Sequence, residues 1–444
     1  MTRLSPIDAA WYHLDQQGRS LDIGALLFFD EHLDMDSLRE LAVAHLAPRR
    51  RFHSRVIEGT LGLGPRWEKD SHFDVDAHLH HQAVPEPGDA ALASLVGDLM
   101  SAPMDLDRPL WDLYLLDHRR DPGGPVGSAL LARVHHCIGD GFALGHLLFS
   151  MGDSRGSAQD AEKKPKTGVK DKKDWLHHIK KLATHPDRIR DDAQLANRTA
   201  RAMGHLVALP FDSETILSRP LSHTRRAAWS APITLDRVKR LSKRLNATVN
   251  DVLMAALSGA LRSYLIDAGE PVSEVKLRAV MPVNLRPARF LEEMPDELGN
   301  HFGLVFVELP IDKATAMDRL FEIKLEIDRL KQTPEAVVAF GILQALGRTP
   351  VSFEHKIEDI FIKKASLVAS NLPGPRTPLY FAGRKLQDFL FWPPHPGDLG
   401  LGMSILSYNG RIRIGIRSDA EVIDDPATLA TYFCREFERI EEIQ

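Results

Sequence analysis

The sequence has little cysteine: 444 residues contain only Cys137 and Cys434. Two cysteines cannot form a disulfide framework or a cysteine-rich zinc site, and such low usage is typical of a reducing, cytoplasmic setting. Excess positive charge is also absent, because 56 lysines and arginines stand against 61 aspartates and glutamates, for a formal net charge of -5. This balance argues against a broad basic surface for nucleic acid.

Long apolar runs are missing as well. No stretch approaches the roughly 18 residues that a membrane-spanning helix needs. The longest apolar runs, such as residues 24–29 and 126–132, have the length of a buried strand. The first residues, MTRLSPIDAAWYHLD, lack the apolar core of a signal peptide. We therefore expect a cytoplasmic protein that meets any lipid substrate from outside the bilayer.

The composition is that of a globular protein of two or three domains, with 43% hydrophobic and 26% charged residues. One change in composition divides the chain: residues 153–181 are first rich in glycine, serine and lysine without apolar periodicity, which is typical of a linker. We predict one domain over residues 1–150, a charged linker and helical connector over 151–220, and a second domain over 221–444.

Strand and helix patterns alternate in both halves, which predicts an α/β or α+β fold with mixed sheets and flanking helices. The most regular helix begins at Thr248, with Asn250 as the expected N-cap and Asp251 in the first turn. Asn409-Gly410 predicts a type I′ hairpin turn. Other expected helices cover 6–14, 38–46 and 142–150, and strands are expected at 23–29, 111–116, 129–135, 227–233, 276–283, 304–309, 367–370, 401–408 and 411–416.

The sharpest motif is HHCIGDG, which comprises His135 to Gly141 and lies between an apolar strand and an apolar helix. Two glycines around one aspartate indicate a tight turn, and tight turns at strand ends often present catalytic side chains. A neutral imidazole there can take a proton from a hydroxyl, while an acid four residues later can orient the loop. From these letters alone, two packing histidines beside a Gly-Asp-Gly turn are an equally good interpretation.

Cys137 offers an alternative nucleophile within the same motif. Adjacent residues in an extended segment point to opposite faces, so His136 is poorly placed to activate it. We therefore favour general-base chemistry over a thiol mechanism.

The motif resembles that of the coenzyme-A-dependent acyltransferase superfamily. Within it, the chain is similar to the bacterial wax ester synthase/acyl-CoA:diacylglycerol acyltransferase family almost from end to end. The blocks that carry the resemblance appear in the family's order: LSPIDAAWYHLD, Pro109-Leu110-Trp111, HHCIGDG, Asn250-Asp251, MPVNLRP, LGNHFG, SNLPGP and LSYNGRIRIGIRSD.

The resemblance implies two chloramphenicol-acetyltransferase-like domains with an active-site channel at their interface. It also implies acyl transfer from acyl-CoA, a co-substrate, to diacylglycerol or a long-chain alcohol, without an acyl-enzyme, a bound cofactor or a metal. By position, His136 is the general base, and Asp140 pairs with an arginine, for which Arg286 and Arg55 are both candidates. His135, Gly139 and Gly141 would support the turn.

Several segments keep two interpretations. Pro109, Leu110 and Trp111 either line the acyl channel or belong to the core, and Asn250 and Asp251 either cap a helix or help to shape the active site. The basic stretch 49–55 either receives coenzyme A phosphates or is a solvated helix end. His78, His80 and His81 suggest a metal only at first glance, because they lack an acid–histidine set with ligand spacing.

Residues 172–185 combine Trp175 and other apolar side chains with lysines, which indicates either a helix on an anionic membrane or a strut between domains. With the resemblance, this predicts reversible contact with the inner face of the cell membrane or with lipid inclusions. Two other functions stay open: a transferase of the same superfamily with a polyketide, peptide or sugar acceptor, and a non-catalytic lipid-binding relative.

Overall fold

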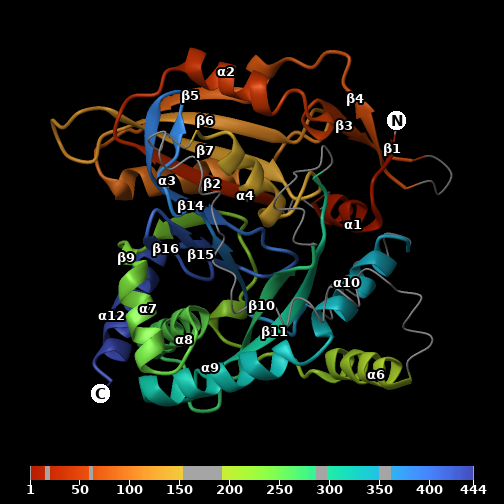
Figure 1. Ribbon diagram of the computed structural model, residues 1–444, viewed down its shortest axis with the longest axis vertical. Helices are drawn as coiled ribbons and strands as arrows, with labels where there is room; N and C mark the ends of the chain where they lie inside the picture. Colours follow the sequence, from red (N-terminus) through yellow and green to blue (C-terminus); the bar gives the residue numbers. More distant parts are fainter. Residues whose placement is uncertain are drawn as a thin grey trace, which may run out of the picture.

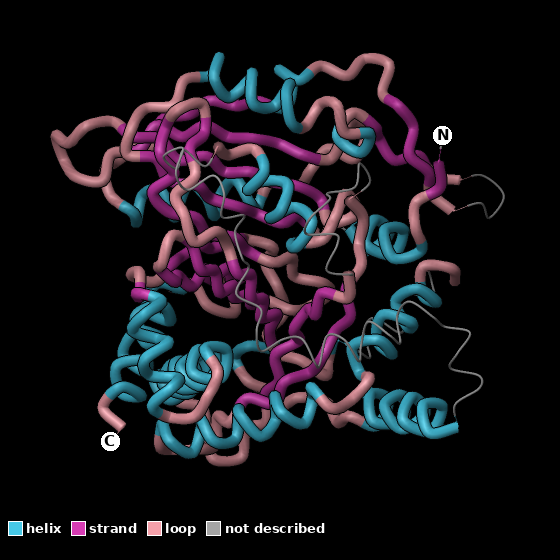
Figure 2. Tube along the Cα trace, in the orientation of Figure 1, coloured by secondary structure: helices cyan, strands magenta, loops and turns pink. Residues whose placement is uncertain are grey.

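Two large mixed sheets form the centre of the molecule, one in the upper and one in the lower half of the view (Figure 1). The computed structural model describes residues 2–15, 21–59, 64–153, 193–286, 298–349 and 362–443. Helices cover the outer sides of both sheets (Figure 2). The α/β class with mixed sheets and flanking helices is therefore confirmed.

The first sheet has six strands, and the β5–β6 pair is its parallel pair. In spatial order it comprises β13 (Tyr380–Phe381), β14 (Arg384–Trp392), β2 (Asp22–Phe29), β7 (Gly127–His135), β6 (Trp111–His118) and β5 (Leu79–Ala83). A small three-stranded sheet beside it comprises β1 (Thr2–Arg3), β4 (Arg66–Lys69) and β3 (Ser54–Ile57).

The second sheet has seven strands, and β12 pairs in parallel with both of its neighbours. In spatial order it comprises β11 (Phe302–Leu309), β10 (Leu277–Asn284), β12 (Leu367–Pro373), β15 (Leu401–Tyr408), β16 (Arg411–Asp419) and β8 (Arg225–Trp229), with β9 (Ile233–Thr234) also on β16. The turn between β15 and β16 has positive φ at Asn409 (46°) and Gly410 (74°), as a type I′ hairpin requires.

The described α-helices lie in both halves of the molecule and between the sheets (Figure 1). They are α1 (Pro6–Asp15), α2 (Met35–His45), α3 (Asp89–Ser101), α4 (Gly141–Ser150), α6 (Ala193–Ala208), α7 (Leu235–Arg244), α8 (Val249–Asp267), α9 (Ala316–Lys331), α10 (Glu335–Leu346) and α12 (Pro426–Glu441). Within the described ranges, no helix is long and apolar enough to cross a membrane.

Two strands from the second half of the chain, β13 and β14, complete the sheet of the first half. Strand β14 pairs antiparallel with β2, with Trp392 opposite Gly24 and Leu390 opposite Leu26. Its apolar pattern is compatible with either sheet, and only tertiary packing assigns it to the first. The predicted contact segment 172–185 lies outside the described residues.

The N-cap of helix α8 lies two residues before the predicted Asn250, whereas the predicted start of the helix at Thr248 agrees with the structure to within one residue. The N-cap is Thr248, whose hydroxyl accepts from the Asp251 backbone N–H at 3.1 Å, while the Asp251 carboxylate accepts from the Thr248 N–H at 2.7 Å. This reciprocal capping box satisfies two donors at the helix start. Asn250 therefore does not cap the helix. Its side-chain amide oxygen instead accepts a hydrogen bond from the Asn371 side-chain amide at 3.0 Å.

Asp22 joins the two sheets electrostatically at the start of β2. Its carboxylate lies 2.8 Å from Nε of Arg133 on β7 and 3.5 Å from Nη1 of Arg417 on β16, and all three residues are buried. Arg417 is fully buried and its pKa falls to about 10, because burial disfavours the charge more strongly than Asp22 favours it. One carboxylate thus stabilises guanidinium groups from both sheets.

We predict that Asp22→Ala lowers the free energy of unfolding by about 3–5 kcal/mol, because it leaves two guanidinium groups buried with less compensation. Urea unfolding should show a lower midpoint with an unchanged slope. Asp36→Ala removes a carboxylate that is 90% exposed on α2 and is the matched control, with a midpoint close to wild type. Equal midpoints for the two variants would contradict the role of Asp22.

Candidate active site

The turn from His135 to Gly141 connects β7 to α4, and Asp140 is the N-cap of α4. Its Oδ1 accepts from the backbone N–H groups of Phe142 (3.1 Å) and Ala143 (3.0 Å). These donors have no partner within a helix, so a carboxylate at the N-cap satisfies them and also favours the helix dipole. The first oxygen of Asp140 therefore fixes where α4 begins.

The second oxygen of Asp140 reaches the other half of the chain. Oδ2 lies 2.6 Å from Nη1 of Arg286 and accepts from the His301 backbone N–H at 2.9 Å. Arg286 also donates to the Gly299 carbonyl at 2.6 Å. The other candidate, Arg55, lies on β3 with its side chain 44% exposed and pairs with Glu68 at 3.0 Å, so Arg286 is the partner of Asp140.

The two glycines of the turn have a different role from the one expected. Neither Gly139 nor Gly141 has a positive φ, so no left-handed conformation explains them. Gly139 forms a parallel bridge with Gly299, and a Cβ on Gly139 would lie 3.2 Å from Cβ of Leu298. A Cβ on Gly141 would meet nothing within 4 Å, and this residue lines the cavity described below. Gly139 therefore allows the segment of Leu298 and Gly299 to approach the turn closely, and Gly141 leaves space in the cavity.

Asp8 on α1 anchors the carbonyl groups of the turn through two intermediaries. Arg51 Nη1 lies 3.0 Å from Oδ2 of Asp8 and donates to the carbonyls of Cys137 (2.9 Å) and Ile138 (3.1 Å). The Asn300 amide donates to Oδ1 of Asp8 at 2.8 Å and to the His136 carbonyl at 2.7 Å. Three successive carbonyls are therefore held by one buried carboxylate, and Arg51 is a structural residue and not part of a solvated helix end.

His135 faces away from the cavity and is fully buried. Its Nδ1 accepts from the Cys137 backbone N–H at 3.0 Å, so this nitrogen carries no proton. Nε2 lies 2.8 Å from Oδ2 of Asp15. The hydrogen bond at Nδ1 and this short contact at Nε2 orient the ring and hold it against the turn.

His136 points to the opposite side, into a cavity. Its ring stacks on Trp11 with centroids 4.3 Å apart and meets Phe302 edge-on at 5.6 Å. Burial lowers the pKa of His136 to about 4, and the opposing effects of Asp140 and Asn300 do not overcome it. The imidazole is therefore neutral at physiological pH. Its Nδ1 is buried, which leaves Nε2 as the nitrogen available to a substrate.

The cavity lies where the two halves meet, and its lining is almost wholly apolar. His136, Asp140 and Ser370 are the lining residues with a strongly polar side chain, and Asp140 is engaged by Arg286. The apolar lining includes Ala10, Trp11, Leu14 and Ile23 from the first half, and Val280, Phe302, Leu304, Phe306, Ala339, Ile342, Leu343, Leu346, Val368 and Phe391 from the second. This composition suits a long hydrocarbon chain.

Other predicted residues lie outside the cavity lining. Pro109, Leu110 and Trp111 are buried in the first core, where Trp111 donates to the Phe52 carbonyl at 2.8 Å. Cys137 is also fully buried in that core. His78, His80 and His81 have separate partners: the Trp111 carbonyl, Asp112 and Asp117.

Sequence reasoning missed the roles of four residues that hold or contact the turn from His135 to Gly141: Asp8, Trp11, Arg51 and Asn300. Asp8 and Trp11 lie in the block LSPIDAAWYHLD, Asn300 in LGNHFG and Arg51 in the basic stretch 49–55, so each segment was singled out without this role. Nothing in the spacing of these residues indicates that they meet, because each contacts groups far away in the chain.

Two family models together match most of the chain. The wax ester synthase/diacylglycerol acyltransferase catalytic domain matches residues 4–253, and the WS/DGAT C-terminal domain matches residues 298–441. A Mycobacterium tuberculosis relative described as a probable diacylglycerol O-acyltransferase is 28% identical, over 97% of this chain and 94% of its own. The O-acyltransferase WSD of Acinetobacter baylyi is 26% identical, over 100% of this chain and 98% of its own.

Solved structures show the same fold. The wax ester synthase/diacylglycerol acyltransferase from Marinobacter aquaeolei VT8 superposes with a TM-score of 0.70 at 22% identity, over 99% of both chains. The first condensation domain of the calcium-dependent antibiotic synthetase has a TM-score of 0.62 at 15% identity, over 100% of this chain and 96% of its own. Both likenesses concern the fold.

We predict that the His136 ring stays neutral well below the ordinary histidine pKa of about 6.5. Because burial lowers its pKa to about 4, the base form predominates above pH 5 and is lost as the pH falls through 4. Ring nitrogen shifts in an NMR titration, assigned with a His136→Gln variant, report this directly. A midpoint near 6.5 would show that the cavity does not desolvate the ring.

Proposed function

The chain belongs to the wax ester synthase/diacylglycerol acyltransferase family, and we propose that its His136 acts as the general base that transfers a fatty acyl group from acyl-CoA to diacylglycerol or a long-chain alcohol. The family is one of O-acyltransferases, which supports acyl transfer to a hydroxyl. The observation that carries the proposed mechanism is a neutral imidazole facing an apolar cavity between the two halves.

In the proposed reaction, one proton moves from the acceptor hydroxyl to His136 and then to the departing sulfur. Nε2 of His136 takes the proton of the acceptor hydroxyl as its oxygen attacks the thioester carbonyl carbon. The tetrahedral oxyanion then collapses, the carbon–sulfur bond breaks, and the departing sulfur receives the proton from His136. The products are an ester and free coenzyme A. No side chain forms a bond to the acyl group, in keeping with the burial of Cys137 in the core.

The surroundings of His136 match this role. Stacking on Trp11 and the bond from Asn300 to the His136 carbonyl fix the ring and the backbone that carries it. Asp140 opposes the fall in the pKa of His136, so its charge favours the imidazolium while the proton resides there. A base that is already oriented loses little entropy on reaching the transition state.

The apolar cavity supports lipid substrates on both sides of the reaction. Its walls come from α1, β10, β11, α10 and the segment around Phe391, and they present almost only apolar side chains to the substrates. An apolar lining keeps water from the thioester, which favours transfer over hydrolysis. Acyl-CoA enters as a substrate and no bound cofactor takes part in the proposed mechanism. We place the enzyme on the inner face of the cell membrane or on lipid inclusions, in reversible contact.

The test is a product profile with purified protein, palmitoyl-CoA, and diacylglycerol and hexadecanol in competition. We expect triacylglycerol, wax ester or both, with release of coenzyme A. His136→Ala should lower the rate by about 10²–10⁴-fold, because general-base catalysis typically contributes that much. Cys137→Ala is the matched control in the same turn and should keep most of its activity.

The outcomes separate the competing interpretations. A folded His136→Ala variant with most of the wild-type rate would show that His136 is not the base. A folded but inactive Cys137→Ala variant would restore the thiol mechanism. Absence of any ester product from the wild-type protein would favour a different acceptor or a lipid-binding role.

A further inference from the structure

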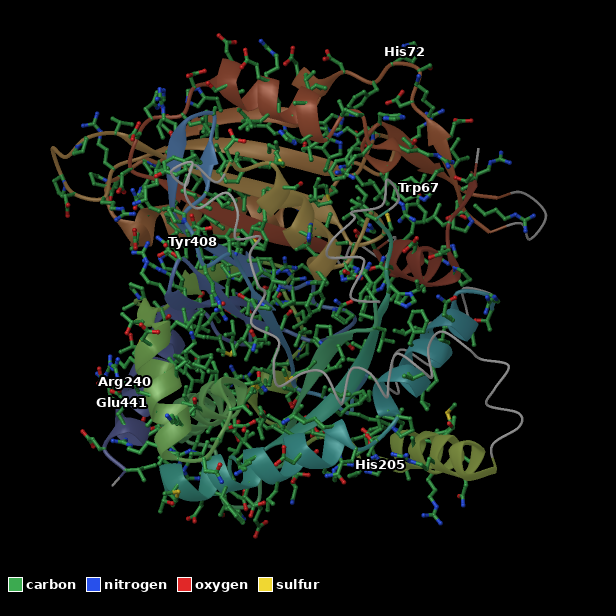
Figure 3. All side chains as sticks on the ribbon, viewed as in Figure 1. Trp67, His72, His205, Arg240, Tyr408 and Glu441 are labelled. Atoms are coloured by element: carbon green, nitrogen blue, oxygen red, sulfur yellow. The ribbon has the colours of Figure 1, made fainter. Side chains whose placement is uncertain are left out.

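Strand β14 belongs to the first sheet but packs against β15 and β16 of the second (Figure 1). Along most of this junction, the buried polar groups have partners. The hydroxyl of Tyr408 on β15 donates to the Leu386 carbonyl at 3.0 Å and accepts from the Leu379 N–H at 2.8 Å (Figure 3). The Ser404 hydroxyl donates to the Phe391 carbonyl. A buried polar group without a partner at this junction therefore needs an explanation.

His395 follows the end of β14 and is fully buried. Its neighbours Pro393, Pro394 and Pro396 line the cavity, whereas His395 is not part of that lining. The imidazole lies instead over Gly402 of β15, where a Cβ would be only 2.3 Å from Nε2 of His395. The ring therefore occupies the place that a side chain of residue 402 would take on the second sheet.

This position brings the imidazole beside a buried guanidinium group. Gly402 lies directly opposite Arg417 in the register of β15 and β16. Side chains at opposed positions of antiparallel strands lie about 5 Å apart, so the His395 ring is a neighbour of the Arg417 side chain. The pKa of His395 is lowered well below its ordinary value, first by burial and then by the charges of Arg417 and Arg225. The imidazole is therefore neutral.

His395 and Arg417 both have polar atoms that other groups leave unsatisfied. Nη1 of Arg417 donates to the Asp22 carbonyl at 3.2 Å. Nε and Nη2 of Arg417 have no hydrogen-bond partner among the described residues, and the same holds for Nδ1 and Nε2 of His395. A guanidinium group only donates, and a neutral imidazole has one N–H and one acceptor nitrogen. The unsatisfied groups beside Gly402 are therefore mainly donors.

The charges around these donors do not balance. Three guanidinium groups, those of Arg133, Arg225 and Arg417, share two carboxylates, those of Asp22 and Asp419. All five residues are at most 2% exposed. Arg417 keeps its charge at neutral pH, because its pKa is still about 10. A water molecule satisfies donors but leaves one positive charge buried without compensation, whereas an anion satisfies the donors and balances the charge.

From these observations we propose that a small monovalent anion, of which chloride is the abundant example, binds between the imidazole of His395 and Nε and Nη2 of Arg417. The anion accepts from the guanidinium N–H groups and from the imidazole N–H. It thereby ties residues 393–396, three of which line the cavity, to β16 of the second sheet. His395 and Arg417 have no part in the proposed acyl transfer, so this inference is independent of that proposal.

The first measurement is the melting temperature of the full-length protein as bromide replaces gluconate at a constant salt concentration of about 300 mM. We expect a saturable rise of about 3 °C, because a ligand that binds only the folded state stabilises it, whereas gluconate is too large for a buried site. Arg417→Met removes both the donors and the excess charge, and should abolish the rise. His395→Phe fills the space of the ring without an N–H, and should raise the half-saturating bromide concentration at least tenfold.

The matched control is Arg319→Met. Arg319 is a buried arginine on α9 that pairs with Glu436, away from this junction. Its replacement should lower the melting temperature in gluconate and leave the rise with bromide intact. An equal rise in wild type and in Arg417→Met would contradict the proposal, as would an unchanged melting temperature of the wild type across the bromide series.

The second measurement decides the case even where Arg417→Met does not fold. Crystals of the wild-type protein grown in bromide should show an anomalous peak between His395 and Arg417. Density there without an anomalous signal would identify a water molecule, and the proposal would be wrong. A bromide peak without any rise in melting temperature would mean an adventitious ion only, which also overturns the proposal.

Discussion

The carboxylate of Asp140 holds the candidate active site together. One oxygen caps α4, and the other pairs with Arg286 and accepts from the His301 backbone N–H. The turn that carries His136 belongs to the first sheet, while Arg286 and His301 belong to the second half of the chain. Separating a buried carboxylate from its guanidinium partner would leave two uncompensated buried charges, which is strongly unfavourable. The pair therefore fixes the position of the turn relative to the second half of the chain.

This join explains why the chemistry depends on both halves. The base comes from the first half, and much of the cavity wall that desolvates it comes from β10, β11 and α10. Burial lowers the pKa of His136 only while that wall is in place. Asp22, with guanidinium partners on β7 and β16, adds a second electrostatic join. The structure thus stabilises the meeting of the two sheets at the place where the reaction is proposed to occur.

The sequence predicted the elements with clear local patterns, such as β15, β16 and the Asn409-Gly410 turn, and it singled out the turn of His136 and Asp140. It narrowed the partner of Asp140 to two arginines but could not choose, because the choice depends on contacts across the chain. The roles of Asp8, Arg51 and Asn300 could not be predicted, because Arg51 and Asn300 bind backbone carbonyls far away in the chain and Asp8 acts through these two residues. The sequence also could not predict that β14 belongs to the first sheet, because packing between segments far apart in the chain decides which strands pair.

The most direct test of the account is a double-mutant cycle on Asp140 and Arg286, measured as kcat/KM for acyl transfer. Asp140→Asn keeps a side chain that caps a helix well but removes the charge, and Arg286→Met removes the guanidinium. If the pair holds the catalytic turn, each single variant loses roughly 10²-fold, and the double variant loses little more than the worse single one. Losses that simply multiply would show that the two residues act independently and would contradict the central role of their contact.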